Sequence, residues 1–325
     1  MRRRRSSRRL TGALALLVSV APGVRAQAGA EGAIFLLLPV GARTVGMGQA
    51  VVADRPGTEA VWWNPAALAR IDKREVAIHH SESVIGTGDA IALALPSQLL
   101  GVLTASVNMT NFGETEATDP EQGTTGKILL RSFVYAATYA TPIGERLSAG
   151  LTYKVLQFRA DCTGACGSLG DLSATSSALD FGAQYDLGAL LPATVAVAVR
   201  NVGPRLQFND QDQSDDLPQR LQIGVNYRVP AMQKVSPDAE LLVAGDVVGD
   251  IQLGSPTMRL GADVGFRRTL HVRGGWVFDD SESSGPSVGL GVAIGGFVVD
   301  LARLFEGFSA DAGEAPTYLS LRYLF

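Results

Sequence analysis

Apolar and polar residues alternate with a period of two along most of this chain, and this pattern constrains the fold more than any other feature of the sequence. The clearest segments are residues 103–110, 147–155, 179–187, 220–228 and 258–266. Successive side chains of a β-strand point to opposite faces, so each segment is predicted to be a strand with one apolar and one polar face. The sequence therefore predicts an all-β protein.

Fourteen strands can be placed, at about 75–84, 88–96, 99–110, 128–141, 146–158, 177–187, 192–201, 218–229, 238–248, 256–267, 269–279, 286–294, 297–304 and 315–325. Strands of a soluble β-sandwich and of a transmembrane β-barrel both show this alternation. The connections distinguish the two folds. Those after the third, fifth, seventh and thirteenth strands (111–127, 159–176, 202–217 and 305–314) are long and polar, whereas those after the second, fourth, sixth, tenth and twelfth are short. This parity predicts a 14-stranded antiparallel transmembrane β-barrel.

The C-terminal strand supports a barrel independently. Leu319, Leu321, Tyr323 and Phe325 share one face, and the last residue is aromatic. A soluble edge strand this apolar would invite aggregation. We predict that Tyr323 and Phe325 form the insertion signal that the barrel-assembly machinery reads.

The first 26 residues have the composition of an export signal. They contain seven of the 28 Lys and Arg residues and no acidic residue. Six of these arginines precede an apolar stretch at 10–21, and the small residues Val24 and Ala26 flank the seventh, Arg25. A membrane anchor needs about 18 to 20 apolar residues, more than are present. Arg8 and Arg9 also allow a twin-arginine signal, but strongly apolar residues do not follow directly. We predict a signal peptide over 1–26.

The rest of the chain is acidic, with 21 Lys and Arg against 32 Asp and Glu. This balance argues against nucleic acid as a partner. The chain after residue 26 contains no apolar stretch long enough for a membrane-spanning helix. The predicted location is the outer membrane of a Gram-negative (diderm) bacterium, where outer-membrane lipid and lipopolysaccharide surround the barrel.

Residues 32–74 lack the alternation and are rich in small side chains. The segments 41–50 (GARTVGMGQA) and 60–69 (AVWWNPAALA) dominate this region. Small residues allow backbones to approach closely, which suits a segment folded inside a lumen. We predict a hatch over 27–73 and a barrel over 74–325, with the excess of glycine, 37 residues, divided between the hatch and the lumen wall. The candidate hatch residues are Gly41, Arg43, Gly46, Gly48, Asn64 and Pro65.

The same segment resembles the N-terminal hatch of the PorV/PorQ family, a branch of the FadL-like outer-membrane barrels. That family has a "GAR..GMG.A" segment followed by "NPA", and residues 200–203 (RNVG), 217–227, 273–275 (RGG) and 289–300 resemble its later strands. The "D-Y-A" of many relatives is D-L-A at 300–302. The resemblance covers nearly the whole mature chain and implies a non-enzymatic 14-stranded barrel plugged by its N-terminus.

Two functions follow as hypotheses. The resemblance implies most directly an accessory of protein secretion, in which the barrel works with components of a type IX-like system and passes cargo to surface attachment. The alternative is FadL-like passive uptake of a hydrophobic ligand, such as long-chain fatty acids or hydrocarbons. Uptake predicts an apolar pocket in the upper barrel near Phe112, Phe133 and Phe158. A purely structural role is a third hypothesis.

Charged residues on the polar faces of the predicted strands would be costly against lipid, so they are predicted to face the lumen. They are Lys154, Asp180, Asp186, Arg220, Arg228, Asp263 and Arg273, accompanied by Gln184 and His271. We expect them to pair with one another and with Arg43, Asp54 and Arg55 of the hatch. A structural network that holds the hatch is the simpler interpretation, and a role in selectivity is the sharper one.

Patterns typical of enzymes or metal sites are incomplete in this sequence. Cys162 and Cys166 lie in a predicted polar loop, and an oxidising compartment favours a disulfide between them over metal binding. Residues 285–289 (GPSVG) match a hydrolase elbow but precede a strand, and residues 210–216 begin like a calcium loop without its glycine or final acid. No enzymatic activity, metal or cofactor is predicted.

Overall fold

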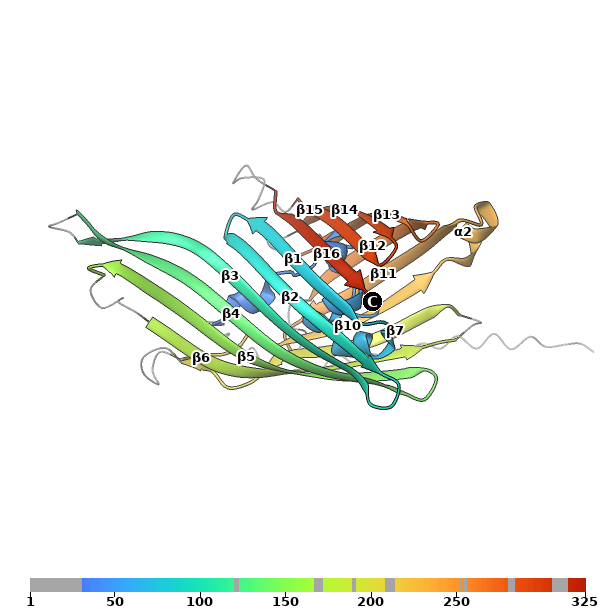
Figure 1. Ribbon diagram of the computed structural model, residues 1–325, viewed down its shortest axis with the longest axis horizontal. Helices are drawn as coiled ribbons and strands as arrows, with labels where there is room; N and C mark the ends of the chain where they lie inside the picture. The colour runs from blue at the N-terminus through green and yellow to red at the C-terminus, as the bar shows by residue number, and fades with distance from the viewer. Residues whose placement is uncertain are drawn as a thin grey trace, which may run out of the picture.

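The computed structural model describes residues 31–119, 123–166, 172–188, 191–207, 214–251, 253, 256–279, 284–305 and 315–325. The predicted signal peptide, most of the connection after the thirteenth strand and part of the calcium-like segment lie outside these residues. Fourteen antiparallel strands form a closed barrel, in which β1 pairs with both β2 and β16 (Figure 1). This is the predicted fold.

The barrel strands are β1 (Glu75–Ser83), β2 (Gly86–Ser97), β3 (Gly101–Asp119), β4 (Gly123–Ile143), β5 (Leu147–Gly164), β6 (Leu172–Asp186), β7 (Ala193–Val202), β10 (Arg220–Arg228), β11 (Ala239–Gly249), β12 (Thr257–Phe266), β13 (Leu270–Phe278), β14 (Gly285–Ile294), β15 (Phe297–Leu304) and β16 (Thr317–Leu324). Ten of them lie close to their predicted ranges, and β3, β4, β5 and β6 extend beyond theirs. The short strands β8 (Leu206–Gln207) and β9 (Ser214–Asp215) form a separate hairpin sheet. None of the helices among the described residues has the length and apolarity needed to span a bilayer.

Two of the long loops were predicted wrongly. Residues 111–119 and 123–127 continue β3 and β4, and 159–164 and 172–176 continue β5 and β6, so these four strands project beyond their neighbours (Figure 1). The apolar alternation fades there, and a register shift between Asn111 and Glu114 interrupts it. Above the hydrocarbon the outer face no longer needs apolar side chains, so hydrophobic periodicity cannot reveal these extensions.

The opposite end of the barrel carries the short connections, as predicted, except that α2 (Pro230–Val235) lies between β10 and β11. The first and the last strand also meet at this end, where the backbones of Arg74 and Phe325 are hydrogen-bonded to each other. Following the usual arrangement of bacterial outer-membrane barrels, we call this the periplasmic end and the opposite one the extracellular end.

The outer face of the barrel is apolar. Alternate residues such as Ile78, Leu103, Leu151, Leu260 and Leu290 are exposed, while their neighbours along each strand are mostly buried. Many of the exposed aromatic residues lie toward the two rims: Tyr139, Tyr185, Phe266, Phe297 and Tyr323 near the periplasmic end, and Trp276 and Phe278 near the other. Aromatic residues at both interfaces are typical of a barrel that crosses a membrane.

Residues 31–74 lie within the barrel. Gly32 is hydrogen-bonded to Asp216 near the extracellular end, and the chain then forms η1 (Ile34–Leu37), α1 (Ala42–Gly46), η2 (Gly57–Trp62) and η3 (Pro65–Arg70) before it joins β1. Their hydrophobic side chains make a core with the small inward residues of the wall, including Ala90, Ala92 and Ala94. We call residues 31–74 the hatch.

Candidate functional site: the hatch and the lumen chambers

One side of the hatch packs directly on glycines of the wall. A Cβ atom added to Gly150 of β5 would lie 2.3 Å from the carbonyl carbon of Pro65, and one added to Gly182 of β6 would lie 2.0 Å from Asn64 Oδ1. Asn64 also caps η3, because its Oδ1 accepts the amide hydrogen of Ala66 at 3.0 Å. Only glycine leaves room for η3 at these positions.

The segment 47–52 packs on glycines of β12 and β13 in the same way. Added Cβ atoms at Gly261 and Gly275 would lie within 2.5 Å of the Met47 and Gly48 backbones. Gly48 has a φ of 60°, and a Cβ atom added to it would collide with the backbone of Trp276, so glycine is required on both sides of this contact. Ser287, from the hydrolase-like segment, lies in β14 and accepts the amide hydrogen of Gly48 at 3.0 Å.

Arg43 of α1 joins the hatch to the wall through ion pairs. Its guanidinium lies 2.6 Å from Asp54 and 3.0 Å from Asp263 of β12. Asp263 also binds Arg273 at 3.0 Å and His271 at 2.9 Å. The lumen network predicted from the sequence thus includes a cluster in which one wall carboxylate contacts three basic side chains.

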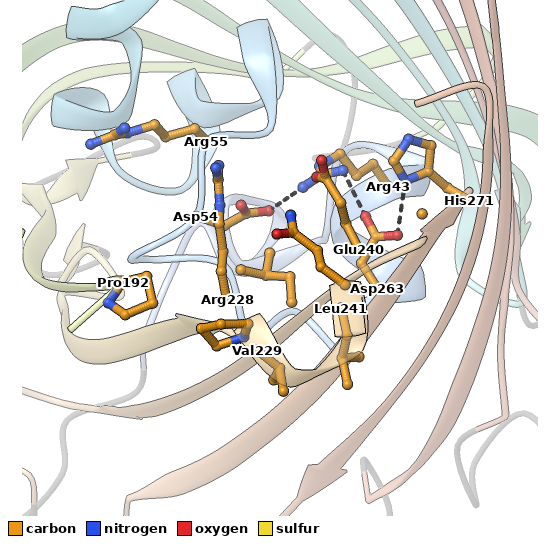
Figure 2. A pocket seen from close by; sticks show the side chains of 14 residues that line it. Arg43, Asp54, Arg55, Pro192, Arg228, Val229, Glu240, Leu241, Asp263 and His271 are labelled. Carbon is orange, nitrogen blue, oxygen red and sulfur yellow. Dashed lines mark hydrogen bonds and ion pairs between the residues drawn. The ribbon is translucent and has the colours of Figure 1, made fainter. Parts of the chain in front are cut away.

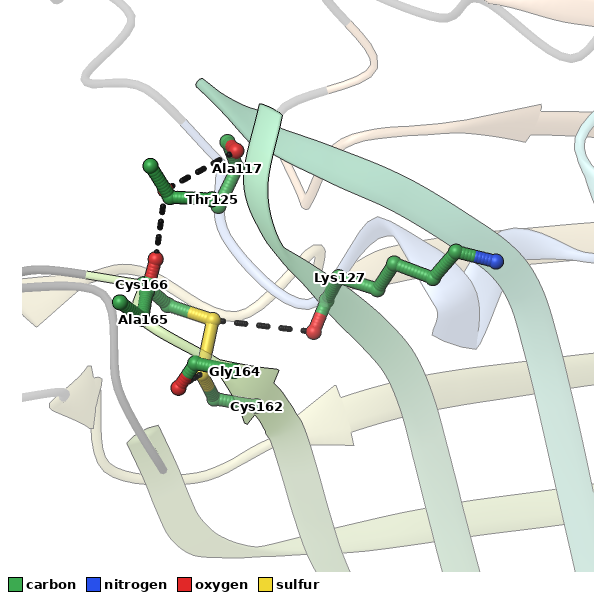
Figure 3. Close-up of a disulfide and its surroundings, with 7 residues drawn as sticks. All are labelled: Ala117, Thr125, Lys127, Cys162, Gly164, Ala165 and Cys166. Carbon is green, nitrogen blue, oxygen red and sulfur yellow. Dashed lines mark hydrogen bonds between the residues drawn. A yellow bond between two sulfur atoms is a disulfide. The ribbon is translucent and has the colours of Figure 1, made fainter. Parts of the chain in front are cut away.

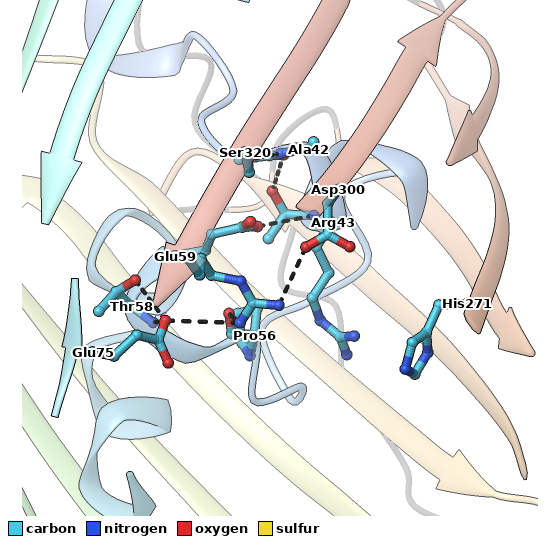
Figure 4. Close-up of polar contacts among 12 residues, drawn as sticks. Ala42, Arg43, Pro56, Thr58, Glu59, Glu75, His271, Asp300 and Ser320 are labelled. Carbon is cyan, nitrogen blue, oxygen red and sulfur yellow. Dashed lines mark hydrogen bonds and ion pairs between the residues drawn. The ribbon is translucent and has the colours of Figure 1, made fainter. Parts of the chain in front are cut away.

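A second wall carboxylate, Asp300 of β15, extends this cluster (Figure 4). It binds Arg273 at 2.6 Å and Arg322 of β16 at 3.2 Å, and its side chain is fully buried. Arg322 reaches the hatch, since it donates to the Pro56 carbonyl at 3.1 Å, and it lies 3.7 Å from Glu75. Glu75 in turn accepts hydrogen bonds from the amide and hydroxyl of Thr58.

Glu59 is a fully buried carboxylate of the hatch, close to this cluster. Its Oε2 accepts the Thr44 amide hydrogen at 3.1 Å, while Oε1 lies 3.9 Å from His79 Nδ1. Burial raises the pKa of Glu59 to about 7, although the charge of Arg322 acts in the opposite direction. The hatch therefore contains a carboxyl group that titrates near neutral pH.

Other predicted lumen residues bind the hatch or each other. Asp186 binds Arg55 at 2.7 Å and lies 3.6 Å from Arg70, and Gln184 donates to the carbonyls of Val52 and Asp54. Lys154 and Asp180 form a buried pair at 2.5 Å.

Arg220 and Arg228 lie apart from the main cluster. Arg220 binds Glu31 at 2.7 Å near the extracellular end. Arg228 lines a chamber near the periplasmic end and forms no ion pair with any residue that the structure describes. The predicted lumen residues therefore all face inward, but they do not all belong to one network.

The lumen holds a chamber on the periplasmic side of the 47–54 segment (Figure 2). Its volume is about 440 Å³, and its wall includes Arg43, Asp54, Arg228, Asp263 and His271. Figure 2 shows Arg43 between the carboxylates of Asp54 and Asp263 at the wall of this space. Apolar residues such as Leu241 and Leu242 also line this chamber, and part of its lining is the ion cluster that fixes α1.

A second chamber of about 510 Å³ lies on the extracellular side of the same segment. The ring of Trp63 lines it, with the guanidinium carbons of Arg200 and Arg259 at 5.5 and 5.9 Å from the ring centroid. Val51 and Val52 donate their amide hydrogens to Asp246 of β11 at 2.7 and 2.9 Å. These bonds hold the 47–54 segment against the wall between the two chambers.

An apolar cluster near the extracellular mouth includes part of the predicted pocket. Phe112 and Phe158 pack against Phe35 of η1, Val134 and Leu156. Phe133 lies elsewhere, because its strand parity places it on the outer face, where it stacks with Tyr135 at 6.3 Å. A prediction of Phe133 as a pocket residue was therefore wrong.

Cys162 and Cys166 form the predicted disulfide, with Cα atoms 6.2 Å apart (Figure 3). Cys162 belongs to β5 rather than to a loop, and Cys166 follows the end of that strand. The disulfide packs beside Ala117, Ile128 and Ala160 of the projecting strands. Within the described residues, no group of three or more His, Cys, Asp or Glu side chains is arranged to hold a metal ion.

Several important residues were not singled out from the sequence. Asp300 and Arg322 have the same inward parity as Asp263 and Arg273, so the rule that found the latter could have found the former. Asp246 also lies in a predicted strand and faces the lumen, so the same rule applies to it. Glu59 and Trp63 gave no such signal, because the hatch has no strand periodicity and nothing in one sequence shows which wall residue it meets.

Known structures share this fold, although no protein-family model and no curated protein matches the sequence. The toluene transporter TbuX of Ralstonia pickettii superposes with a TM-score of 0.59 at 12% identity, over 88% of this chain and 98% of that chain. The monoaromatic hydrocarbon channel CymD gives 0.59 at 13%, over 91% and 99%. A Pseudomonas aeruginosa FadL homologue gives 0.50 at 10%, over 88% and 98%.

These similarities establish the fold and no more. The chain shares the fold of a FadL homologue and of barrels described as a toluene transporter and a hydrocarbon channel, in line with the broader resemblance. The outer-membrane location therefore stays a prediction with which this shared fold agrees. None of them bears on the narrower resemblance to PorV and PorQ.

Proposed function

We propose that this protein is a non-enzymatic, passive outer-membrane route for small hydrophobic molecules, such as monoaromatic hydrocarbons or long-chain fatty acids. The observation that carries the proposal is a lumen with a chamber on each side of a hatch segment, in a fold shared with barrels described as a toluene transporter and a hydrocarbon channel. No bond is made or broken in such transport, so the polar residues serve to hold the hatch.

The apolar cluster at the extracellular mouth is the proposed entry site. Phe112 and Phe158 are only partly buried against this cluster, so they offer an apolar surface that water would otherwise cover, and a hydrophobic molecule gains free energy there. The next space along the barrel is the chamber lined by Trp63. Passage beyond it requires the 47–54 segment to move from the wall, since that segment separates the two chambers.

The secretion hypothesis rests on the hatch motifs alone. GARTVGMGQA and the following NPA resemble PorV and PorQ, and we retain a role with secretion components and cargo as the second proposal. The similar solved structures are described as transporters and channels, which favours uptake. Deletion of the gene would distinguish the two: under the uptake proposal, proteins with C-terminal sorting domains remain secreted and anchored.

Transport can be measured with radiolabelled toluene and oleate in proteoliposomes that contain the full chain. We expect uptake above that of empty liposomes, and a several-fold lower rate for Phe158→Ser. Phe133→Ser is the matched control, because this phenylalanine lies on the outer face and its loss should leave uptake unchanged. Equal uptake by empty liposomes and by the wild-type protein would refute the proposal.

A further inference from the structure

Two arginines lie directly opposite each other on the outer face of the barrel. Arg131 of β4 pairs in register with Arg159 of β5. Both have the strand parity of exposed Tyr135 and Tyr153, so their side chains point away from the lumen. Like charges directly across two strands repel each other, which makes this placement unfavourable in the absence of a shared anion.

Among the residues that the structure describes, acidic side chains neutralise only one of the two arginines. Arg131 forms an ion pair with Asp161 on the same face. Arg159 forms no ion pair with any described residue; its guanidinium carbon lies 6.0 Å from the centroid of the Phe133 ring. The ring holds the guanidinium near the surface of the barrel while its donors stay open to the surroundings.

The pair lies where the apolar outer face ends. On the periplasmic side of it, the outer face of β4 and β5 presents Phe133, Tyr135 and Tyr153. On the extracellular side it presents charged residues, including Lys127 paired with Glu114 at 3.1 Å. Phe133 and Tyr135 stack on each other, as expected of aromatic residues at a membrane interface. The arginines therefore lie at the headgroup level of the outer leaflet.

We propose that Arg131 and Arg159 bind a phosphate group of lipid A in the outer leaflet. Guanidinium groups match phosphate oxygens with paired hydrogen bonds, and a phosphate between them would remove the repulsion across the two strands. The aromatic surface below would contact the lipid's acyl chains. The proposal uses the outer-membrane location and is independent of what the lumen transports.

The opposite rim provides a natural control. Arg267 also lies over an aromatic ring, 5.1 Å from the centroid of Phe266, but it pairs with Asp238 at 3.1 Å near the periplasmic end. Arg267→Gln thus removes one surface charge and one ring contact without touching the proposed site.

Binding can be measured by native mass spectrometry of the purified full chain in detergent, with lipid A carrying both phosphates and with dephosphorylated lipid A as probes. We expect the phosphorylated form to bind at least about tenfold more tightly, the scale of one charge-assisted contact. Arg131→Gln combined with Arg159→Gln should abolish this preference, whereas Arg267→Gln should preserve it. Heat-dependent gel mobility verifies that each variant is a folded barrel.

Asp161→Asn should change the binding of phosphorylated lipid A in the opposite direction. Removing this carboxylate frees Arg131 for phosphate, so the variant should bind phosphorylated lipid A more tightly than the wild type. The proposal is overturned if the wild type binds the two lipids equally. It is also overturned if a folded Arg131→Gln, Arg159→Gln protein keeps the full preference for phosphate, or if Asp161→Asn weakens binding.

Discussion

The two sides of the lumen hold the hatch by different means. Against β5 and β6, η3 packs so closely on Gly150 and Gly182 that no other side chain fits, and the ion pairs that Asp186 of β6 forms with Arg55 and Arg70 are partly exposed to solvent. Against β12, β15 and β16, the hatch is held by buried charges centred on Asp263 and Asp300, in addition to close packing. Shape complementarity is insensitive to pH and salt, whereas an ion cluster depends on the charge of every member.

This difference indicates which side moves. The η3 side is a fixed anchor, because its contacts are lost only if the backbone shifts. The α1 side, together with the 47–54 segment that separates the chambers, can be released by changing one charge. We therefore expect an opening hatch to leave the wall at β12–β16 first.

The largest expected effect comes from Asp300→Asn. The substitution keeps the size of the side chain but leaves Arg273 and Arg322 buried without this counter-charge. Breaking a buried pair in this way costs about 3–5 kcal/mol, so hydrogen exchange of the amides of residues 41–56 should accelerate strongly. Asp238→Asn, which breaks the exposed pair with Arg267, is the control and should change exchange little. Equal exchange in the two variants would contradict a charge-held α1 side.

A change of pH should have the next largest effect. The pKa of Glu59 rises from 4.5 to about 7 on burial in the hatch, so the folded protein holds a proton that an undocked chain has released. The contribution of Glu59 to docking is therefore greatest below about pH 4.5 and is lost as pH rises through about 7, by about 3 kcal/mol in total. Hatch amides should exchange faster at pH 8 than at pH 5 after correction for intrinsic rates. Glu59→Gln should flatten this dependence; a dependence equal to that of the wild type would exclude Glu59 as its source.

Gly150→Ala should have a smaller and differently located effect. The added methyl group overlaps the Pro65 backbone, and overpacking of this kind typically costs about 1–3 kcal/mol. Exchange should increase in η3 while α1 stays protected. Gly274→Ala is matched, because this glycine lies on the outer face and an added Cβ would have no heavy atom nearer than 4.0 Å. Loss of protection in α1 as well would mean that the two sides open together.

The sequence predicts most of the barrel because a membrane imposes a rule at every second residue. Lipid excludes charge from one face of each strand, so parity places Lys154, Asp263 and Arg273 in the lumen. Where that rule stops, the prediction fails, as it does for the extracellular extensions of β3, β4, β5 and β6. For Phe133 the rule held but was not applied: its residue type suggested a pocket, although its parity in the strand placed it on the lipid-facing side. The partners of hatch residues such as Arg43 and Glu59 depend on how an aperiodic segment folds, which local patterns do not encode.

The central claim is that the hatch closes the path between the two chambers. Single-channel conductance in planar bilayers tests it most directly, with the full chain compared to a chain that lacks residues 41–70 and is shown by heat-dependent gel mobility to form a barrel. We predict that the full chain is nearly silent and that the shortened chain conducts with large, stable openings. Conductance of the full chain equal to that of the shortened chain would contradict the account.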